Sequence, residues 1–163
     1  MFKKETGFEL AAPCGLYCGN CEIYRAFRDD DFEALAGYAK EMNSPVDRVK
    51  CEGCRSDFTM FWCPECEVRR CNEEKSLSFC FECEDFPCVA LIEFEDQAPH
   101  HSLCVENLER MVEVGISAWL EEQDEMWRCG RCRTKVTYYT EKCPNCSYEV
   151  EKKQSRPLAD RPH

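Results

Sequence analysis

Apolar residues recur at helical spacing in several short stretches of the chain. Residues 22–28 and 89–95 each predict a short helix on this basis. Asp31 can cap a further helix that runs to about Met42, because an apolar face continues through that stretch. These helices alternate with segments in which cysteine and polar residues show no helical period.

The stretch 99–127 is helical in pattern and nearly free of cysteine. Ser102 can cap a long segment in which large apolar residues recur, and Gly115 can divide this segment into two helices. The recurring positions are Leu108, Met111, Val112, Gly115, Trp119 and Met126. We interpret them as a core stripe that packs against the cysteine-rich part of the chain.

Near the C-terminus the pattern changes from helix to strand. Residues 133–140 are rich in β-branched and aromatic side chains, which favours a hairpin strand. Cys129 and Cys132 precede this segment, and Cys143 and Cys146 follow it. The spacing is typical of a zinc ribbon, in which two cysteine pairs surround one ion. With four protein ligands the site would be closed, so we expect it to be structural.

Together these elements predict a small metal-stabilised α+β fold. It would contain an irregular cysteine-rich zinc-knuckle module with helices, then more helices, then a C-terminal β-hairpin zinc ribbon. We expect a metal-binding domain at 10–98, a helical connector packed on it at 99–127, the ribbon at 128–150 and a flexible tail at 151–163.

Cysteine is the most informative part of the composition, with 16 among 163 residues. The chain opens without an apolar signal sequence, and no apolar run is long enough to cross a bilayer. We therefore expect a cytoplasmic protein with reduced thiols and no membrane contact. Six C-x-x-C pairs favour several Zn²⁺ ions per chain over disulfides or a thioredoxin-like redox pair.

The N-terminal metal sites have candidate ligands but no defined pairing. Four C-x-x-C pairs could fill two four-cysteine sites, and three cysteines would then be left over. The candidates are Cys14, Cys18, Cys21, Cys51, Cys54, Cys63, Cys66, Cys71, Cys80, Cys83 and Cys88. Cys104, His100 and His101 are further possible ligands, although a thiol on a helix is more often buried in the core. The number of ions stays open.

The stretches 62–71 and 79–88 share one cysteine pattern at an offset of 17 residues. In both, an aromatic residue precedes C-x-E-C, and another cysteine follows five positions later. We interpret the repeat as a duplicated metal knuckle, because so short a unit needs an ion to compensate for its small core. Chance periodicity is the alternative.

Iron–sulfur or redox chemistry is the main alternative to zinc. Cys14, Cys18 and Cys21 have the spacing of the radical-SAM cluster motif, but Asn20 stands where those enzymes usually carry an aromatic residue, and no βα repeats follow. A reactive thiolate beside the arginines at 69–70 and a metal-storage role are further alternatives. No Ser-His-Asp arrangement or phosphate-binding loop is present, so we predict no catalytic residue and lean away from an enzyme.

Charge divides the chain into two unequal parts. The formal net charge is −11, and residues 1–125 carry 12 Lys and Arg against 28 Asp and Glu. Residues 126–153 reverse this balance, with 7 basic against 3 acidic side chains. Nucleic acid could therefore bind only there, where Arg128, Arg131, Arg133, Lys135 and Lys142 accompany Trp127, Tyr138 and Tyr139. We expect an unknown protein partner instead, and hence an interaction or adaptor module.

The ordered cysteine motifs resemble an uncharacterised cysteine-rich zinc-binding family, the domain of unknown function 3795. The motifs are C-G-L-x-C-x-x-C from Cys14, C-x-G-C from Cys51, C-x-x-C-E-V-R-x-C from Cys63 and F-C-x-x-C-x-x-F-P-C from Phe79, roughly within residues 12–95. A longer subset of that family is similar also in His100-His101, Glu106-Asn107-Leu108, Trp119-Leu120 and a terminal zinc ribbon. The resemblance implies metal binding and no substrate. Arg133 and Ser147 depart from the glycine that usually follows the second cysteine of each ribbon knuckle.

Overall fold

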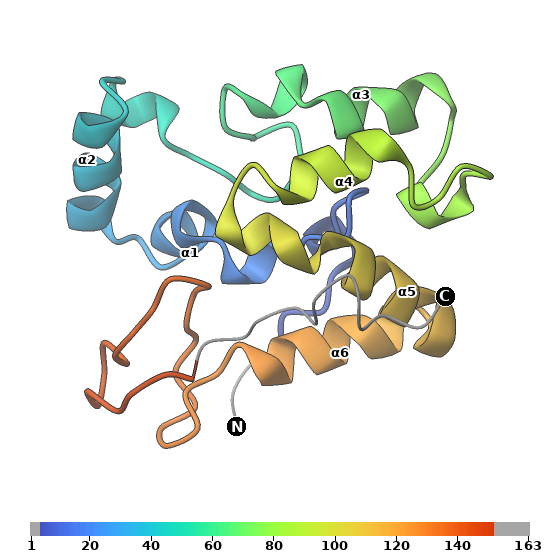
Figure 1. Cartoon of the computed structure of the whole chain (residues 1–163). Helices are drawn as coiled ribbons and strands as arrows, with labels where there is room; N and C mark the ends of the chain where they lie inside the picture. The colour runs from blue at the N-terminus through green and yellow to red at the C-terminus, as the bar shows by residue number, and fades with distance from the viewer. Residues whose placement is uncertain (1–3, 152–163) are drawn as a thin grey trace.

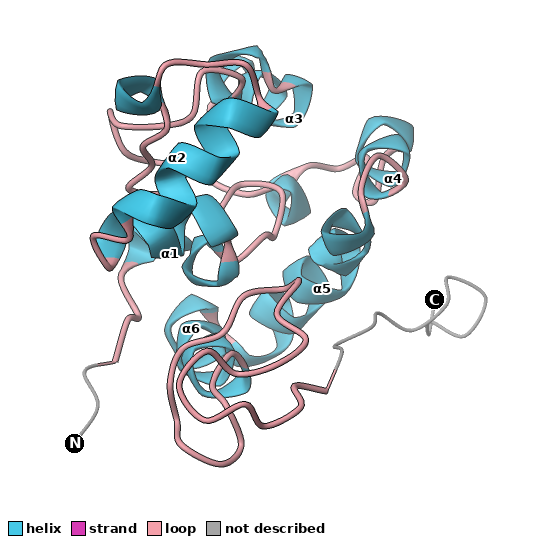
Figure 2. Cartoon of the chain, turned by 90° about the vertical axis from the view of Figure 1, so that its left-hand side faces the viewer, coloured by secondary structure: helices cyan, strands magenta, loops and turns pink. Residues whose placement is uncertain are grey.

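The computed structural model describes residues 4–151 as a helical protein (Figures 1 and 2). Its helices are α1 (Glu22–Arg28), α2 (Phe32–Glu41), α3 (Glu67–Glu74), α4 (Val89–Glu95), α5 (Cys104–Val114) and α6 (Ile116–Met126). Single 3-10 turns connect them: η1 (Phe8–Leu10), η2 (Cys18–Asn20), η3 (Val46–Arg48), η4 (Cys63–Glu65), η5 (Cys80–Glu82) and η6 (Pro99–Leu103). The tail predicted at 151–163 lies, apart from its first residue, outside the described residues.

The predicted C-terminal β-hairpin, and with it the α+β class, is wrong. Residues 4–151 contain no β-strand, only isolated backbone bridges. Two of these bridges, Arg128–Lys135 and Lys142–Glu149, lie in residues 128–150, which we call the C-terminal module. Each bridge closes the loop around one cysteine pair, and the two loops do not extend into a common sheet.

Contacts with the rest of the protein explain why residues 133–140 form no hairpin. The Tyr138 N–H donates to the Asn20 carbonyl at 3.1 Å, so this backbone bonds to the turn before α1 and not to a second strand. The Thr140 hydroxyl then accepts from the Thr137 N–H at 2.9 Å, which folds the chain into a turn. Tertiary contacts thus override the strand propensity of these side chains.

Three of the predicted helices, α1, α2 and α4, form where the apolar pattern places them. The Asp31 carboxylate caps α2, because it accepts a backbone N–H of the first turn at 3.0 Å. Gly115 separates α5 from α6 at a left-handed φ of 84°, a conformation that favours glycine. The predicted cap at Ser102 is wrong: its hydroxyl donates to the Pro99 carbonyl at 2.7 Å, and α5 begins at Cys104.

Helix α3 is an element that the apolar pattern does not predict. Its only buried side chains are Val68 and Asn72, and most of the others are charged. A single buried apolar residue gives no helical period to detect. The helix begins directly after Cys66, so it continues from the 3-10 turn of a cysteine pair.

The main core joins distant parts of the chain. Buried side chains from the N-terminal segment, from α4, α5 and α6 and from the C-terminal module share one cluster. At its centre the Tyr17 ring meets the edge of Trp119 at a centroid distance of 6.1 Å. A smaller cluster packs α1 against α2. No helix within residues 4–151 combines the length and apolar character that a membrane crossing requires.

Candidate metal centre

Four cysteine sulfurs converge in the C-terminal module. The Sγ atoms of Cys129, Cys132, Cys143 and Cys146 all lie within 4.8 Å of one another. Cys129 and Cys146 are 3.6 Å apart, and Cys132 and Cys143 are 3.4 Å apart. Sulfurs around a tetrahedral Zn²⁺, with Zn–S about 2.3 Å, are about 3.8 Å apart. All four cysteines are free thiols, so this arrangement could hold a metal ion.

Two matching turns build this four-cysteine site. In each turn, the residue after the second cysteine donates its N–H to the carbonyl of the first: Arg133 to Cys129 at 3.0 Å, and Ser147 to Cys143 at 2.9 Å. Arg133 and Ser147 have left-handed φ angles of 65° and 56°. The knuckle turn is therefore kept at both positions without the usual glycine, at a cost in backbone strain.

Hydrogen bonds make two of these sulfurs acidic. The backbone N–H of Cys132 lowers the pKa of Cys129 below its ordinary value. Hydrogen bonds that the thiolate accepts from the Thr134 hydroxyl, 3.2 Å away, and from the Asn145 side chain lower the pKa of Cys132 to about 5. The Tyr148 N–H acts likewise on Cys146, but burial and the neighbouring thiols outweigh it and raise that pKa to about 12. A cation that binds all four sulfurs would displace the remaining protons.

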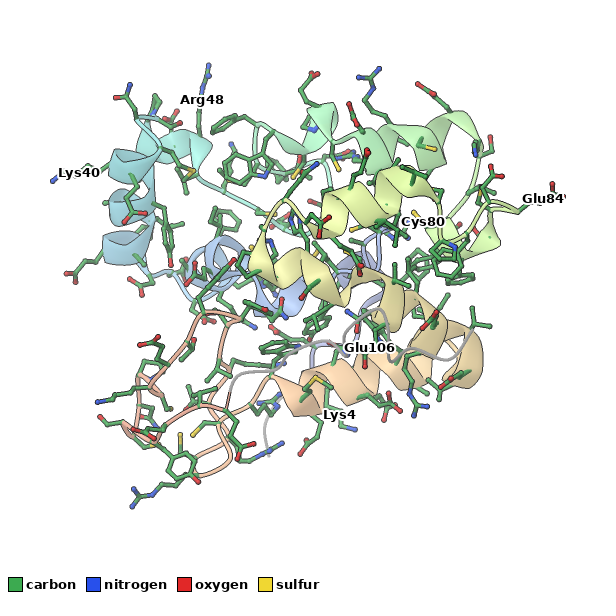
Figure 3. The ribbon with its side chains drawn as sticks, viewed as in Figure 1. Lys4, Lys40, Arg48, Cys80, Glu84 and Glu106 are labelled. Atoms are coloured by element: carbon green, nitrogen blue, oxygen red, sulfur yellow. The ribbon has the colours of Figure 1, made fainter. Side chains whose placement is uncertain are left out.

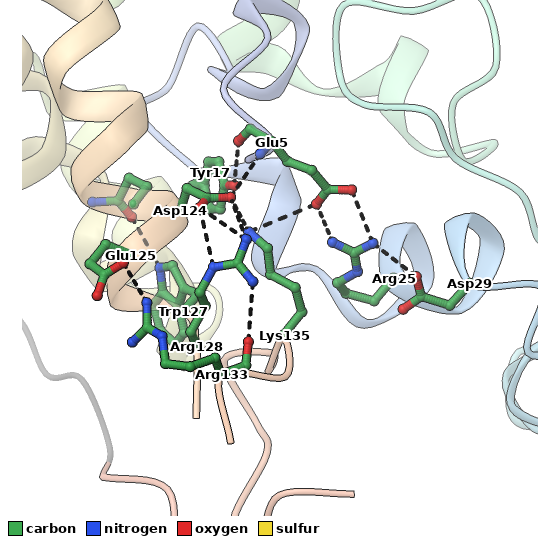
Figure 4. Close-up of polar contacts among 11 residues, drawn as sticks. Glu5, Tyr17, Arg25, Asp29, Asp124, Glu125, Trp127, Arg128, Arg133 and Lys135 are labelled. Atoms are coloured by element: carbon green, nitrogen blue, oxygen red, sulfur yellow. Dashed lines mark hydrogen bonds and ion pairs between the residues drawn. The ribbon is translucent and has the colours of Figure 1, made fainter. Parts of the chain in front are cut away.

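A buried carboxylate at the end of α6 holds the C-terminal module on the helical body (Figure 4). Asp124 accepts from Arg128 at 3.1 Å, from the Lys135 ammonium and from the Glu5 backbone N–H at 2.8 Å. The side chains of Asp124 and Arg128 are only 3% and 5% exposed. Burial raises the pKa of Asp124, but the hydrogen bonds from Lys135 and Glu5 outweigh it and hold that pKa below its usual value.

Other basic and aromatic side chains of the module also bond to the body. Arg133 pairs with Glu125 on α6, and the Tyr138 hydroxyl donates to a carbonyl of η6 at 3.0 Å. The Tyr139 hydroxyl lies 2.8 Å from His100 Nδ1. Much of the predicted basic and aromatic surface therefore faces the acidic part of this same chain.

The N-terminal cysteines are less tightly gathered. Within residues 4–151, the C-terminal four are the sole group of three or more potential metal ligands whose donor atoms lie within 4.8 Å of one another. Three N-terminal pairs still share one local structure: η2, η4 and η5 each form a 3-10 turn. In all three, the second cysteine donates its N–H to the carbonyl of the first at 3.1–3.2 Å.

Burial makes several of these thiols weak acids. The Cys54 N–H donates to the Cys18 sulfur at 3.4 Å, which brings the first two cysteine motifs together. Burial raises the pKa of Cys18, and it raises the pKa values of Cys54 and Cys63 to about 12. The charge of Arg69 lowers both of the latter, but by less than burial raises them. The raised pKa values favour the protonated form of these thiols while no cation is bound.

The three sulfurs of the radical-SAM-like motif, Cys14, Cys18 and Cys21, do not all lie within 4.8 Å of one another. Cys14 is buried and hydrogen-bonded to Cys104, also buried, and this bond raises the pKa of Cys14. The structure thus places these two cysteines in the core as a thiol pair. His100 bonds to Tyr139, and His101 Nδ1 lies 2.9 Å from the Phe94 carbonyl.

Two side chains that donate hydrogen bonds to N-terminal cysteine sulfurs are not predicted from the sequence. Asn72 Nδ2 donates to Cys80 Sγ at 3.1 Å, and Lys75 Nζ donates to Cys83 Sγ at 3.2 Å. Asn72 lies on α3, and Lys75 directly follows its last residue. A spacing of three residues places two side chains on one face of a helix, so it would have indicated a shared role only if α3 had been predicted.

A protein-family model described as a protein of unknown function (DUF3795) matches residues 10–93. The match covers slightly more than half of the 163 residues. Comparisons with curated proteins and with solved structures found no match. The four C-terminal cysteines lie beyond the matched residues, so the family match alone does not account for this site.

Proposed function

Because the chain belongs to the DUF3795 family, whose function is unknown, we propose a function from its own residues: a structural zinc protein that serves as a protein-interaction module. The observation that carries the zinc proposal is the close approach of four free sulfurs at Cys129, Cys132, Cys143 and Cys146. Four thiolate ligands leave no position for water or substrate, which is typical of structural zinc. Cysteines within residues 14–88 would bind further zinc ions.

The size of the C-terminal module supports a structural ion. This module spans 128–150, has no helix or strand, and contributes Val136 as its one buried aliphatic side chain. So little apolar burial cannot order 23 residues by itself. A bound ion would cross-link the two turns and thereby fix the backbone between them.

The metal is tested by analysis of the untagged protein purified without oxygen. We expect bound zinc and neither iron nor sulfide, and we expect the double variant Cys129→Ser/Cys132→Ser to lose one zinc ion per chain. In NMR spectra of that variant, signals of residues 128–150 should collapse toward random-coil positions while those of α5 persist. Stoichiometric iron and sulfide, with absorption near ~400 nm, would instead establish the iron–sulfur alternative.

An exposed aromatic segment supports the interaction role. The side chains of Phe58, Phe61 and Trp62 are each 43–52% exposed, and the ring centroids of Phe61 and Trp62 lie 4.9 Å apart. Aromatic side chains are enriched where proteins bind one another. Because basic residues of the C-terminal module pair within the chain, these aromatics favour a protein partner over nucleic acid. Such a partner would be met in the cytoplasm, where the thiols stay reduced.

Photo-crosslinking in the cell tests the interaction role. A crosslinking amino acid at Phe61 should capture one discrete protein, because that ring is exposed. The same amino acid at Val112, which is 63% exposed on α5, is the matched control and should capture none. Equal crosslinking from both positions would show random collision and would contradict an interaction surface at Phe61.

A further inference from the structure

A second set of four cysteines shares one small cavity between α3 and the loop that follows it. In Figure 3, Cys80 marks this region beside α4, well away from the C-terminal module. The cavity has a volume of about 30 Å³. The residues that could bind or support an ion there are Cys71, Asn72, Lys75, Cys80, Cys83 and Cys88.

Two hydrogen bonds already hold α3 against the η5 turn at this cavity. Asn72 donates to the Cys80 sulfur at 3.1 Å, and Lys75 donates to the Cys83 sulfur at 3.2 Å. Cys71 and Lys75 are four residues apart, so they lie on one face at the end of α3. The helix therefore presents a thiol and two N–H donors to the same turn.

Asn72 borders the cavity and carries a buried oxygen without a partner. Asn72 is 3% exposed, and its Nδ2 bonds to Cys80 and to the Val68 carbonyl. Its Oδ1 is buried and lacks a hydrogen-bond partner. An unsatisfied buried acceptor destabilises the fold, so the protein alone does not fully satisfy the polar groups at this end of α3.

We propose that Cys71, Cys80, Cys83 and Cys88 bind one zinc ion as four thiolates, at a second site separate from the C-terminal one. The inference rests on the proposed function for its chemistry and adds the ligand set. It also assigns Cys71 to one unit of the repeat. Cys71 ends the first unit but also precedes Cys80, the first cysteine of the second unit, by nine residues, so the sequence leaves its unit open. The cavity groups it with the second unit.

A nearby ammonium would offset part of the charge of a four-thiolate zinc ion in this cavity. Four thiols lose their protons on binding, so a zinc ion with four thiolates carries a net charge of about −2. The Lys75 ammonium, which donates to Cys83, offsets part of this charge and also pairs with Asp85 at 3.6 Å.

The ligands must move closer together to bind. No three of these four sulfurs lie within 4.8 Å of one another, so the cysteine side chains would rotate inward around the ion. Cys71 is exposed, whereas Cys129 and Cys143 at the C-terminal site are buried. We therefore expect a chelator to remove this ion sooner than the C-terminal one.

Metal analysis of full-length variants tests the ligand set. Cys80→Ser/Cys83→Ser should contain one zinc ion fewer than the unaltered protein, and the matched pair Cys129→Ser/Cys132→Ser should also lose one. The combined quadruple variant should lose two. If the first pair keeps the full zinc content while the second loses one ion, this inference is wrong and the C-terminal site stands. If the second pair loses none, the proposed function fails instead.

Lys75→Ala provides a test that does not depend on altering a ligand. In this test cadmium replaces zinc, and the cadmium NMR spectrum of Lys75→Ala is compared with that of the unaltered protein. One resonance of an all-sulfur site should shift in the variant, because the N–H···S bond to Cys83 is lost. The C-terminal resonance should not move. Lys40→Ala on α2 is the control and should move neither (Figure 3). Cadmium resonances that all stay unmoved in Lys75→Ala would overturn the site, even if the serine variants failed to fold.

Discussion

Two residues in the C-terminal module occupy backbone conformations that their side chains disfavour. Arg133 and Ser147 both have left-handed φ angles, directly after the second cysteine of a knuckle. Such a conformation costs a residue with a β-carbon about 1 kcal/mol or more relative to glycine. Their hydrogen bonds to the carbonyls of Cys129 and Cys143 need this geometry, because each closes a turn around two sulfurs.

We predict that Ser147→Gly stabilises the metal-bound protein by about 1 kcal/mol, because glycine removes the strain at φ 56°. Ser147 is the better test position, since Arg133 also pairs with Glu125. The measurement is the free energy of unfolding in urea, with Ser147→Ala as a control that should change it little. Destabilisation by glycine would show that the turn is not strained.

At the scale of elements, the sequence predicted what the apolar period could reveal. The helices α1, α2 and α4 and the break at Gly115 follow from side-chain spacing and capping alone. Helix α3 could not be found, because its order comes from Val68, Asn72 and the preceding cysteine pair. The hairpin expected at 133–140 failed because its backbone bonds to the turn before α1, a contact that local propensity does not contain.

The same limit applies to the candidate sites. Cysteine spacing was sufficient to predict that Cys129, Cys132, Cys143 and Cys146 gather in one group, because both pairs lie within 18 residues. It could not sort Cys14, whose neighbour Cys104 is distant in the sequence, nor Cys71 and Cys88, which stand outside the C-x-x-C pairs and so have several possible partners. Only the fold shows that Cys14 meets Cys104, and that Cys71 and Cys88 line one cavity.

The contact between η6 and the C-terminal module should depend on pH through His100. Burial lowers the pKa of His100 from 6.5 to about 4, so the folded protein keeps this ring neutral. Between these values the unfolded chain binds more protons than the folded one. The stability contributed by neutral His100 is therefore complete above pH 6.5 and is lost as the pH falls toward 4.

Comparison with His100→Gln isolates this effect from the protonation of the thiolates. Glutamine can still bond to the Tyr139 hydroxyl but does not titrate. We expect the unfolding free energy of the variant to fall less steeply across pH 6.5 to 4 than that of the unaltered protein. Parallel pH profiles for the two proteins would show that His100 is not held neutral by the fold.

At the scale of the whole molecule, Asp124 connects three segments that are distant in the chain. It binds the N-terminal segment at Glu5 and the C-terminal module at Arg128 and Lys135 (Figure 4). Replacement by asparagine would leave Arg128 and Lys135 partly or fully buried without their common counter-charge. Removal of one partner from a buried ion pair is strongly destabilising, because the remaining charge stays desolvated.

We predict that Asp124→Asn lowers the free energy of unfolding by about 3 kcal/mol, measured in urea. Glu121→Gln is the matched control, since Glu121 on the same helix pairs with Lys4 only at the surface and should contribute under about 1 kcal/mol. The zinc content of Asp124→Asn should stay unchanged, because all four C-terminal ligands lie within the module itself. Equal effects of the two substitutions would mean that charge pairing at Asp124 does not hold the module on the body. Loss of zinc from Asp124→Asn alone would mean instead that the four-cysteine site depends on docking, and that the module cannot retain its ion without the helices.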